Sequence, residues 1–427
     1  MRTSAAPGIE RNSLALAVSG VVTAGVGLVY WIVMGRLYPA TEVGAAAAVI
    51  TTATVLSAFG NLGLGAYFER FLPVAGAQSL SLPTRGLVVG ATVGAVLSLG
   101  FLVVGPTDEM FATSAQMALF PVVVVVLSGF ALLDHVSIAM QRADWAARKN
   151  IAHAVLKLLV AAGVASVAGR LGMILSWVLT AIVLAVVLWV VIRRALLVAA
   201  QTPPTDSVTM PPWSDQRRFI AGNFGIYVAT ALTPLILPPV VIGLVGAEEN
   251  AYFAIVWSLV SAVIVLMTML MGPYVAAASA QPGDVVSLTR RFVGILALVA
   301  GVSSIGLLTV GPFLLQLAGP GYASAGTPLM RLAALALPLA VAGLAFTAIC
   351  RVRRKLLPAL LVQVLNATVM LTLCTVWISR HGLQGAGWGL IVAEGLTTVV
   401  VAIPLIRILS GRDRRWADQD QDQVQHS

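Results

Sequence analysis

This sequence is poor in charge and in the side chains that usually build catalytic or metal sites. Only 10% of its 427 residues are charged, and it has four histidines and two cysteines. These residues form no cluster with metal-ligand spacing, and no glycine-rich phosphate loop occurs, which argues against a metal centre and against ATP hydrolysis. Cys350 and Cys374 fall in separate apolar segments and predict no disulfide framework. We therefore expect neither an enzyme nor a bound cofactor.

Long apolar runs fill the space that charged residues leave, since 59% of the chain is hydrophobic. A helix needs about 20 apolar residues to cross a bilayer. The pattern predicts an all-α polytopic membrane protein with about 12 transmembrane helices. The predicted spans are 14–34, 44–66, 86–105, 117–139, 151–168, 173–192, 219–245, 251–272, 292–314, 328–349, 357–378 and 388–409.

The distribution of lysine and arginine predicts the orientation of these helices. Short loops that carry basic residues stay in the cytoplasm, and a cytoplasmic N-terminus places 21 of the 26 basic residues on the inner side. Both termini are then expected in the cytoplasm, at the plasma membrane of a bacterium. The net charge of +9 is explained by this topology signal, so we expect no nucleic-acid partner. The first apolar run has no small-residue cleavage site, which predicts a retained helix.

The longest loop, 193–218, is proline-rich and basic at both ends, and it separates two six-helix halves. We predict an N-terminal half (1–194), a cytoplasmic linker (195–217), a C-terminal half (218–410) and a disordered cytoplasmic tail (411–427). Arg11 and Arg218 precede corresponding helices, and the same offset places Glu42 on Glu249. Two similar halves that meet at a central site are a common transporter design.

Two polar residues interrupt the apolar run 151–168, and a third lies directly before it. At about 100° per residue, Asn150, His153 and Lys157 share one face of a helix, which should turn away from lipid because a charge in hydrocarbon is costly. Lys157 has three interpretations: an ion pair with Asp134, a cation that lines a solute cavity, or a lysine that snorkels to the inner surface. An ion pair that also lines the cavity would combine the first two.

Other charged residues fall within or beside predicted spans. Glu394 lies six residues into the last span. It is expected to be the partner of a nearby arginine such as Arg331, a hydrogen-bonded core group, or a proton carrier. Arg36 and Arg70 bracket the second helix and its connection, as interfacial anchors or as ligands of an anionic substrate.

Three prolines crowd the seventh span. Pro234, Pro238 and Pro239 lie within six residues and predict a break or strong bend. Broken helices in transporters tend to lie beside the substrate path, although a plain packing kink is an equal alternative.

Several segments resemble the oligosaccharide flippase and polysaccharide exporter family, within the multidrug, oligosaccharidyl-lipid and polysaccharide exporter superfamily. In "GRLYPATEVGAAAAVITTATVLSAFGNLGLG" (35–65), the family pattern is matched by Arg36-Leu37, Pro39, Glu42, Gly44 and the glycine-rich turn at 61–65, although Val43 replaces the usual aromatic residue. The segments "QRADWAARKNIAHAVLKLL" (141–159), "LAGPGYASAGTPLMRLAALALPL" (317–339) and "SRHGLQGAGWGLIVAEG" (379–395) are also similar to that family. The resemblance extends over nearly the whole chain.

The resemblance implies two six-helix halves around a central cavity that opens alternately to the two sides of the membrane. It implies a transporter that flips a polyprenyl-pyrophosphate-linked oligosaccharide from the inner to the outer leaflet, surrounded by membrane lipids and with a glycan polymerase or glycosyltransferase as partner. The predicted substrate-binding residues are Lys157, His153, Asn150, Arg36, Arg70 and Arg331, with Asp134 and Glu394 as structural or coupling charges.

Two other functions stay open. One is a cation-coupled drug or metabolite exporter of the same superfamily, which the absence of acidic residues from several spans disfavours. The other is a non-transporting membrane component of a glycan assembly complex, which would need no intramembrane charges.

Overall fold

The computed structural model describes residues 7–199, 210–280, 285–353 and 355–411, which form helices and no strands. Contacts within the chain divide it into two compact units, which we call unit 1 (Met1–Ala251) and unit 2 (Tyr252–Ser427). The division falls inside a long helix, downstream of the linker that the sequence repeat indicates. The predicted limits of the two halves stay a prediction, and the tail beyond 411 lies outside the described residues.

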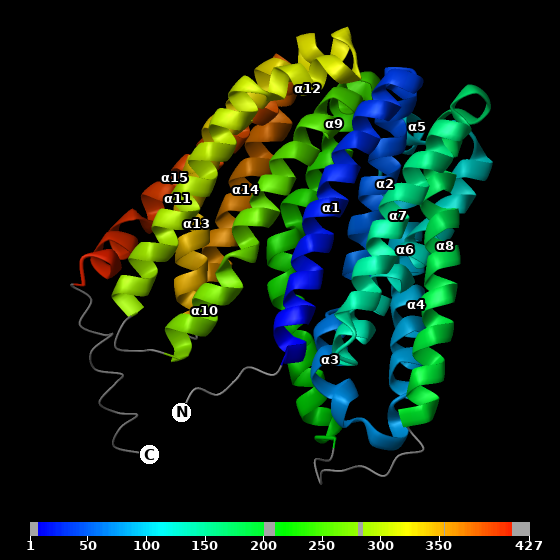
Figure 1. Ribbon diagram of the computed structural model, residues 1–427. Helices are drawn as coiled ribbons and strands as arrows, with labels where there is room; N and C mark the ends of the chain where they lie inside the picture. Colours follow the sequence, from blue (N-terminus) through cyan, green and yellow to red (C-terminus); the bar gives the residue numbers. More distant parts are fainter. Residues whose placement is uncertain (1–6, 200–209, 281–284, 354, 412–427) are drawn as a thin grey trace. The chain divides into compact units, whose positions relative to one another are not determined.

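The helices follow one another in the order that Figure 1 shows. Unit 1 contains α1 (Pro7–Leu37), α2 (Ala40–Gly60), α3 (Leu64–Phe71), the 3-10 turns η1 (Leu72–Val74) and η2 (Gly76–Gln78), α4 (Ser81–Val104), α5 (Thr107–Met110), α6 (Ser114–Ala139), α7 (Ala143–Gly163), α8 (Ala165–Ala199) and most of α9 (Trp213–Met269). Unit 2 contains the end of α9, α10 (Met271–Ala280), α11 (Val285–Thr309), α12 (Gly311–Ala318), α13 (Pro320–Val352), α14 (Leu356–His381) and α15 (Leu383–Leu409).

The predicted fold class and helix number are confirmed. Ten segments of the described chain are long and apolar enough to cross a membrane. Helix α7 is not among them, because it carries several charged residues. One candidate, Ile236–Val275, extends across Gly246, whose dihedrals are not helical, and therefore covers parts of two predicted spans. Counting α7 and both parts of α9 gives about twelve.

The seventh span is not broken at its prolines, and the predicted bend or kink there stays a prediction. The backbone stays helical through 234–239, and the only non-helical dihedrals inside α9 are those of Gly246 (φ 81°, ψ 177°). Membrane helices tolerate proline when the freed carbonyl groups find partners. The interruption occurs at Gly246 because a left-handed backbone conformation favours glycine.

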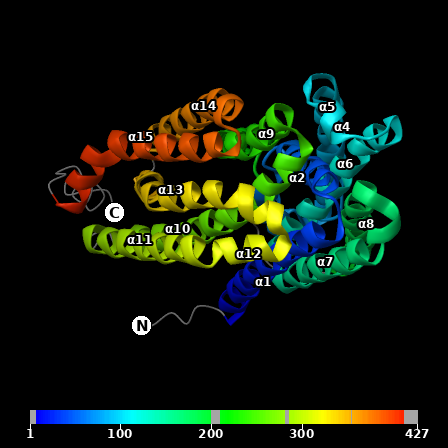
Figure 2. The same ribbon diagram turned by 90° about the horizontal axis from the view of Figure 1, so that it is seen from above.

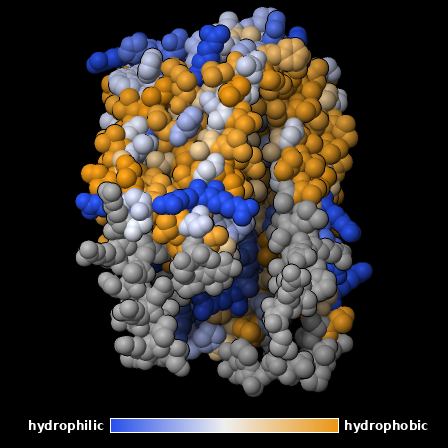
Figure 3. Space-filling model, turned by 60° about the vertical axis from the view of Figure 1, so that its left-hand side comes forward, coloured by the Kyte–Doolittle hydropathy of each residue, from blue (hydrophilic) through white to orange (hydrophobic). Residues whose placement is uncertain are grey.

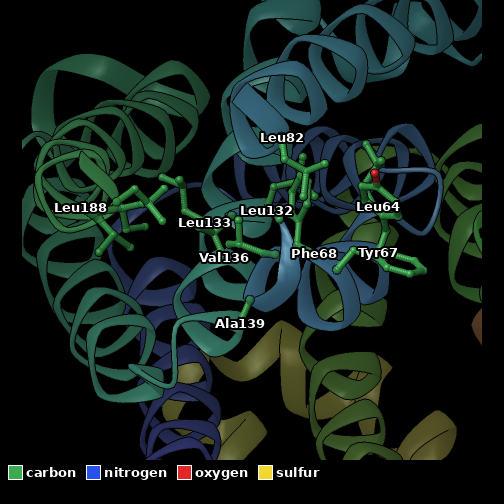
Figure 4. Close-up of a cluster of buried hydrophobic side chains, with 14 residues drawn as sticks. Leu64, Tyr67, Phe68, Leu82, Leu132, Leu133, Val136, Ala139 and Leu188 are labelled. Atoms are coloured by element: carbon green, nitrogen blue, oxygen red, sulfur yellow. The ribbon is translucent and has the colours of Figure 1, made fainter. Parts of the chain in front are cut away.

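In unit 1, α6 is central and packs against α4, α2 and α8, while α7 packs against α1 and α8. A cluster of buried hydrophobic side chains joins α3, α4, α6 and α8 at one end of the unit (Figure 4). Tyr67 and Phe68 come from α3, Leu82 from α4 and Leu132 from α6. Leu188 extends the same cluster onto α8, so the start of α4 and the later turns of α8 lie at one level of the membrane.

In unit 2, α13 lies between α11 and α15, and α14 packs on α15 (Figure 2). The Tyr274 and Phe292 rings are stacked with their centroids 4.2 Å apart, and the Tyr274 hydroxyl lies 2.8 Å from Thr289 Oγ1. Gly385 lies so close to the backbone of Trp377 that a larger side chain would collide with it. Glycine therefore allows α14 and α15 to approach closely.

The described surface is largely apolar (Figure 3). Val104 is 84% exposed and Val399 70%, although both belong to candidate membrane spans. Exposed valine and leucine in such numbers are expected where a helix faces lipid instead of water. These faces identify a multi-pass membrane protein.

Candidate functional site

The polar residues of α7 lie inside unit 1, as their shared helical face predicts. His153 and Lys157 are each 7% exposed, and Lys149, which the predicted topology places in an inner loop, is 5% exposed. These residues face α1, α6 and α8. Lipid does not solvate them, so each must find partners within the protein.

The predicted ion pair of Asp134 with Lys157 is wrong. Lys149 Nζ lies 2.8 Å from Asp134 Oδ1, and the Asn150 amide donates to Asp134 Oδ2 at 2.9 Å. The predicted pair assumes that α7 enters the membrane at Lys149, but α6 ends at Ala139 and α7 begins at Ala143. With this tight turn, residues 134 and 149 are nearly equidistant from Gln141 and therefore reach the same depth.

Phe130 completes the surroundings of Lys149. Its carbonyl oxygen accepts a hydrogen bond from Lys149 Nζ, and its ring centroid lies 3.3 Å from the same nitrogen. The His153 ring also packs on Phe130, with centroids 4.7 Å apart, and His153 Nε2 lies 3.1 Å from the Trp177 carbonyl oxygen. Lys149 and His153 are thus held by defined partners in unit 1.

Lys157 has a different environment. Its Nζ lies 3.3 Å from the centroid of the Trp177 ring and 5.5 Å from that of Tyr30. In the part of the chain that the structure describes, it forms no ion pair. The Tyr30 hydroxyl and the Trp177 indole N–H are buried and make no hydrogen bond of acceptable geometry. Lys157 therefore has two aromatic rings as neighbours and, among the described residues, no carboxylate partner.

A second charged network lies at the opposite end of unit 1 and has no counterpart among the sequence predictions. Glu42, near the start of α2, accepts a hydrogen bond from the Arg170 backbone N–H at 2.6 Å and from Arg170 Nη2 at 2.8 Å. Arg170 Nη1 also donates to the Met110 carbonyl oxygen at 3.4 Å. Gly169 adopts φ 48°, and a Cβ there would lie 3.0 Å from Glu42 Oε2. The network ties α2, α5 and α8 together.

We expect Glu42→Gln to lower the free energy of unfolding by about 1–2 kcal/mol, because it turns charge-assisted hydrogen bonds into neutral ones. Denaturant unfolding of the purified protein in detergent measures this change. Glu109→Gln is the matched control, since Glu109 is an exposed carboxylate on neighbouring α5. An equal effect of the two substitutions would show that the network adds nothing to stability.

Glu394 in unit 2 has a neutral partner. It is half-buried on α15 and accepts a hydrogen bond from the Asn366 amide of α14 at 3.2 Å. Asn366 also donates to Thr397 Oγ1 at 2.9 Å. The predicted partner Arg331 is exposed on α13, and the described residues show no ion pair between it and Glu394.

The remaining predicted arginines lie on the surface. Arg36 is exposed in the last turn of α1. Arg70 on α3 is exposed, and its guanidinium lies 4.7 Å from the centroid of the Phe219 ring. The structure therefore brings together Lys157, His153, Asn150 and Asp134, and places Arg36 and Arg70 outside that group. Their assignment to a substrate site stays a prediction.

Among the described residues, no three histidine, cysteine, aspartate or glutamate side chains are grouped in a way that could hold a metal ion. Cys350 and Cys374 are buried and not bonded to each other.

No family model and no curated protein matches the sequence. Solved structures, however, match its fold along nearly the full length. One is described as the inward-facing conformation of a multidrug resistance MATE family transporter of the MOP superfamily; it has a TM-score of 0.64 and 13% identity, and the match covers 93% of this chain and 98% of that one. The MATE multidrug transporter DinF-BH, solved as a complex, has a TM-score of 0.59 and 19% identity, over 97% and 98% of the two chains.

A MATE structure in complex with MaL6 matches with a TM-score of 0.61 and 13% identity, over 94% of this chain and 96% of that one. At such identities the likeness concerns the fold and leaves the substrate open. The chain is a multi-pass membrane protein with the fold of the MATE transporters, which are not enzymes.

Proposed function

We propose that this chain is an exporter of a drug-like or metabolite solute that carries an anionic group. The observation that carries this proposal is the match of the fold, over more than nine-tenths of the chain, to proteins described as multidrug transporters. The proposal includes the plasma membrane of a bacterium as the location, and the basic residues of the short loops support an orientation with both termini in the cytoplasm. A drug or metabolite exporter, coupled to a cation, is the alternative that the sequence leaves open, and the anionic group on the solute is added here from the charge of the α7 cluster.

The charge of the α7 cluster supports an anionic solute. Lys149 and Lys157 supply two amines and Asp134 supplies one carboxylate, which already pairs with Lys149. Lys157 therefore has no carboxylate partner among the described residues. A second buried carboxylate would be expected near this position if the solute were a cation, because opposite charges must meet in a site that excludes water.

The donors around Lys157 define how such a solute would be held. The Lys157 amine, the Trp177 indole N–H and the Tyr30 hydroxyl come from three helices, α7, α8 and α1. An anionic oxygen among them would accept charge-assisted hydrogen bonds, which are stronger than neutral ones. Because Lys157 is only 7% exposed, the solute must bind to a conformation in which these helices separate.

We expect Lys157→Met to slow export of an anionic solute by at least about tenfold, since a hydrogen bond to a charged group contributes about 1.5–3 kcal/mol. Cells that produce the protein are loaded with an anionic or a cationic fluorescent dye, and retention of each dye is followed. Arg148→Met is the control, because Arg148 lies on the same helix and its side chain is 77% exposed. Wild-type cells that retain the anionic dye like cells without the protein would refute the proposal.

A second candidate is the flipping of a polyprenyl-pyrophosphate-linked oligosaccharide. The observation that favours it is the same unneutralised Lys157, because a pyrophosphate in a water-poor site needs cationic partners. The sequence motifs at 35–65 and 379–395 also support it by resemblance. A glycan polymerase or glycosyltransferase would then be the partner that supplies or uses the lipid-linked glycan.

Leaflet transfer separates the two candidates. Vesicles that contain the purified protein and a fluorescent polyprenyl-pyrophosphate-linked sugar are treated with a reductant that cannot cross the membrane. A flippase exposes the inner-leaflet label and the signal falls nearly to zero, whereas a soluble-anion exporter leaves about half of the label protected, as in vesicles without protein. Lys157→Met should slow whichever of the two activities is present by at least about tenfold.

A further inference from the structure

An apolar groove lies on the surface of unit 1 and is lined by residues of α4, α6 and α8. Helix α6 packs against both α4 and α8 (Figure 1). Its volume is about 270 Å³. The only polar atom among its lining side chains is the indole nitrogen of Trp189. The groove is lined by Leu87 of α4, by Val125, Val126, Gly129, Phe130 and Leu133 of α6, and by Ile182, Ala185, Val186 and Trp189 of α8.

The groove lies within the membrane-crossing part of unit 1. All three helices that form it are candidate spans. The surface beside it carries exposed apolar side chains, among them Val88 of α4 at 60% and Val183 of α8 at 59%. A groove that opens on such a surface meets lipid acyl chains and not water.

One end of the groove is basic. On α8, Ile182, Val186, Trp189 and Arg193 follow at intervals of four, three and four residues, so they form one stripe that ends in a charge. Arg193 and the adjacent Arg194 are exposed. Trp189 is partly exposed and suits the boundary between acyl chains and headgroups, where tryptophan is enriched.

Helix α4 adds a further positive charge at the same end. Leu82 of α4 and Ile192 of α8 belong to one buried cluster, so the first turn of α4 lies level with the end of the α8 stripe. Arg85 is exposed close to that turn. Neither α4 nor α8 contains an acidic residue. The groove therefore offers an apolar channel for a chain and positive charge for an anionic headgroup.

The wall of the groove also borders the charged cluster. Phe130 lines the groove, and its carbonyl and ring hold Lys149 while its ring packs on His153. A molecule in the groove would contact Phe130, the residue that holds Lys149 beside Asp134. Occupancy should therefore stabilise unit 1.

We propose that this groove binds an anionic phospholipid, with an acyl chain along α6 and the phosphate at Arg193, near Arg85 and Arg194. The inference is independent of the solute that the protein exports. Anionic lipids are attracted to basic residues at the membrane surface, and the groove adds a fixed place for the chain.

The test measures lipid binding to the full-length protein in detergent, by native mass spectrometry with phosphatidylglycerol and phosphatidylcholine of identical chains. We expect phosphatidylglycerol to bind at least about fivefold more tightly, and Arg193→Ala to remove most of this preference. Arg291→Ala is the matched control, since Arg291 is an exposed arginine near the start of α11. Equal binding of the two lipids, or an equal loss in both variants, would overturn the proposal.

A second variant tests the place of the acyl chain. A Cβ on Gly129 would have Leu87 Cδ2 at 3.9 Å as its nearest neighbour, so Gly129→Leu should fill the groove without a backbone clash. It is expected to weaken binding of both lipids, whereas Gly294→Leu on α11, where a Cβ meets nothing within 4 Å, should not. Denaturant unfolding of the two variants in the absence of lipid checks that both are folded. Unchanged lipid binding by folded Gly129→Leu would refute an acyl-chain site. So would stabilisation of the protein by glycerol phosphate alone that equals its stabilisation by phosphatidylglycerol.

Discussion

Asp134→Ala is expected to lower the free energy of unfolding by about 3–5 kcal/mol, because it leaves a buried ammonium group without its carboxylate. The Lys149 side chain is only 3% exposed, and its remaining partners are the carbonyl and ring of Phe130. Asn150 would lose its acceptor in the same substitution. The cost arises from desolvation, which an unpaired buried charge cannot offset.

Denaturant unfolding in detergent micelles measures the effect. Asp108→Ala removes an exposed carboxylate from α5 and should change stability by less than about 0.5 kcal/mol. The double variant Asp134→Ala with Lys149→Met should recover much of the loss, because an apolar pair of similar volume needs no compensation. If the double variant were as unstable as Asp134→Ala alone, the loss would not come from the unpaired lysine.

Gly44→Ala is expected to cost at least about 3 kcal/mol, because the new methyl group would overlap the backbone of α9. A Cβ at Gly44 would collide with the Ala247 carbonyl and lie 2.8 Å from the Ala251 nitrogen. These are backbone atoms and cannot rotate away. The Asn250 amide also donates to the Gly44 carbonyl oxygen at 2.8 Å, and separation of the two helices would break this hydrogen bond.

The control for Gly44 is Gly25→Ala on α1. A Cβ at Gly25 meets nothing within 4 Å, so alanine there should stabilise the helix by up to about 1 kcal/mol. Thermal unfolding of both variants in the same detergent gives the comparison. A Gly44→Ala protein as stable as the wild type would show that α2 and α9 do not cross this closely.

The spans were predictable because their signal is local. About twenty apolar residues in succession identify a membrane helix without knowledge of its neighbours. The same local reasoning placed His153 and Lys157 on a buried face, since helical periodicity depends only on spacing along the chain. The position of the break in α9 was not predictable from proline content, because neighbouring helices decide whether a freed carbonyl is satisfied.

Which charged residues pair with one another depends on turn geometry, and this geometry could not be predicted from the sequence. Asp134 pairs with Lys149 because Gln141 adopts φ 59° in a tight connection, which shifts α7 toward the membrane relative to the expected loop. The Glu42–Arg170 network joins residues 128 positions apart. Its one local signal is Gly169, the residue before Arg170, whose flexibility permits the left-handed backbone at that point.

Transport by the purified protein in vesicles measures whether Lys157 binds the anionic group of an exported solute, as we propose. An anionic dye and a cationic dye of similar size are supplied on one side, and their movement is followed for wild type, Lys157→Met and the exposed-site control Arg148→Met. We expect the wild type and the control to move the anion, and Lys157→Met to move it at least about tenfold more slowly. Movement of the cation but not the anion, or full activity of Lys157→Met, would contradict it.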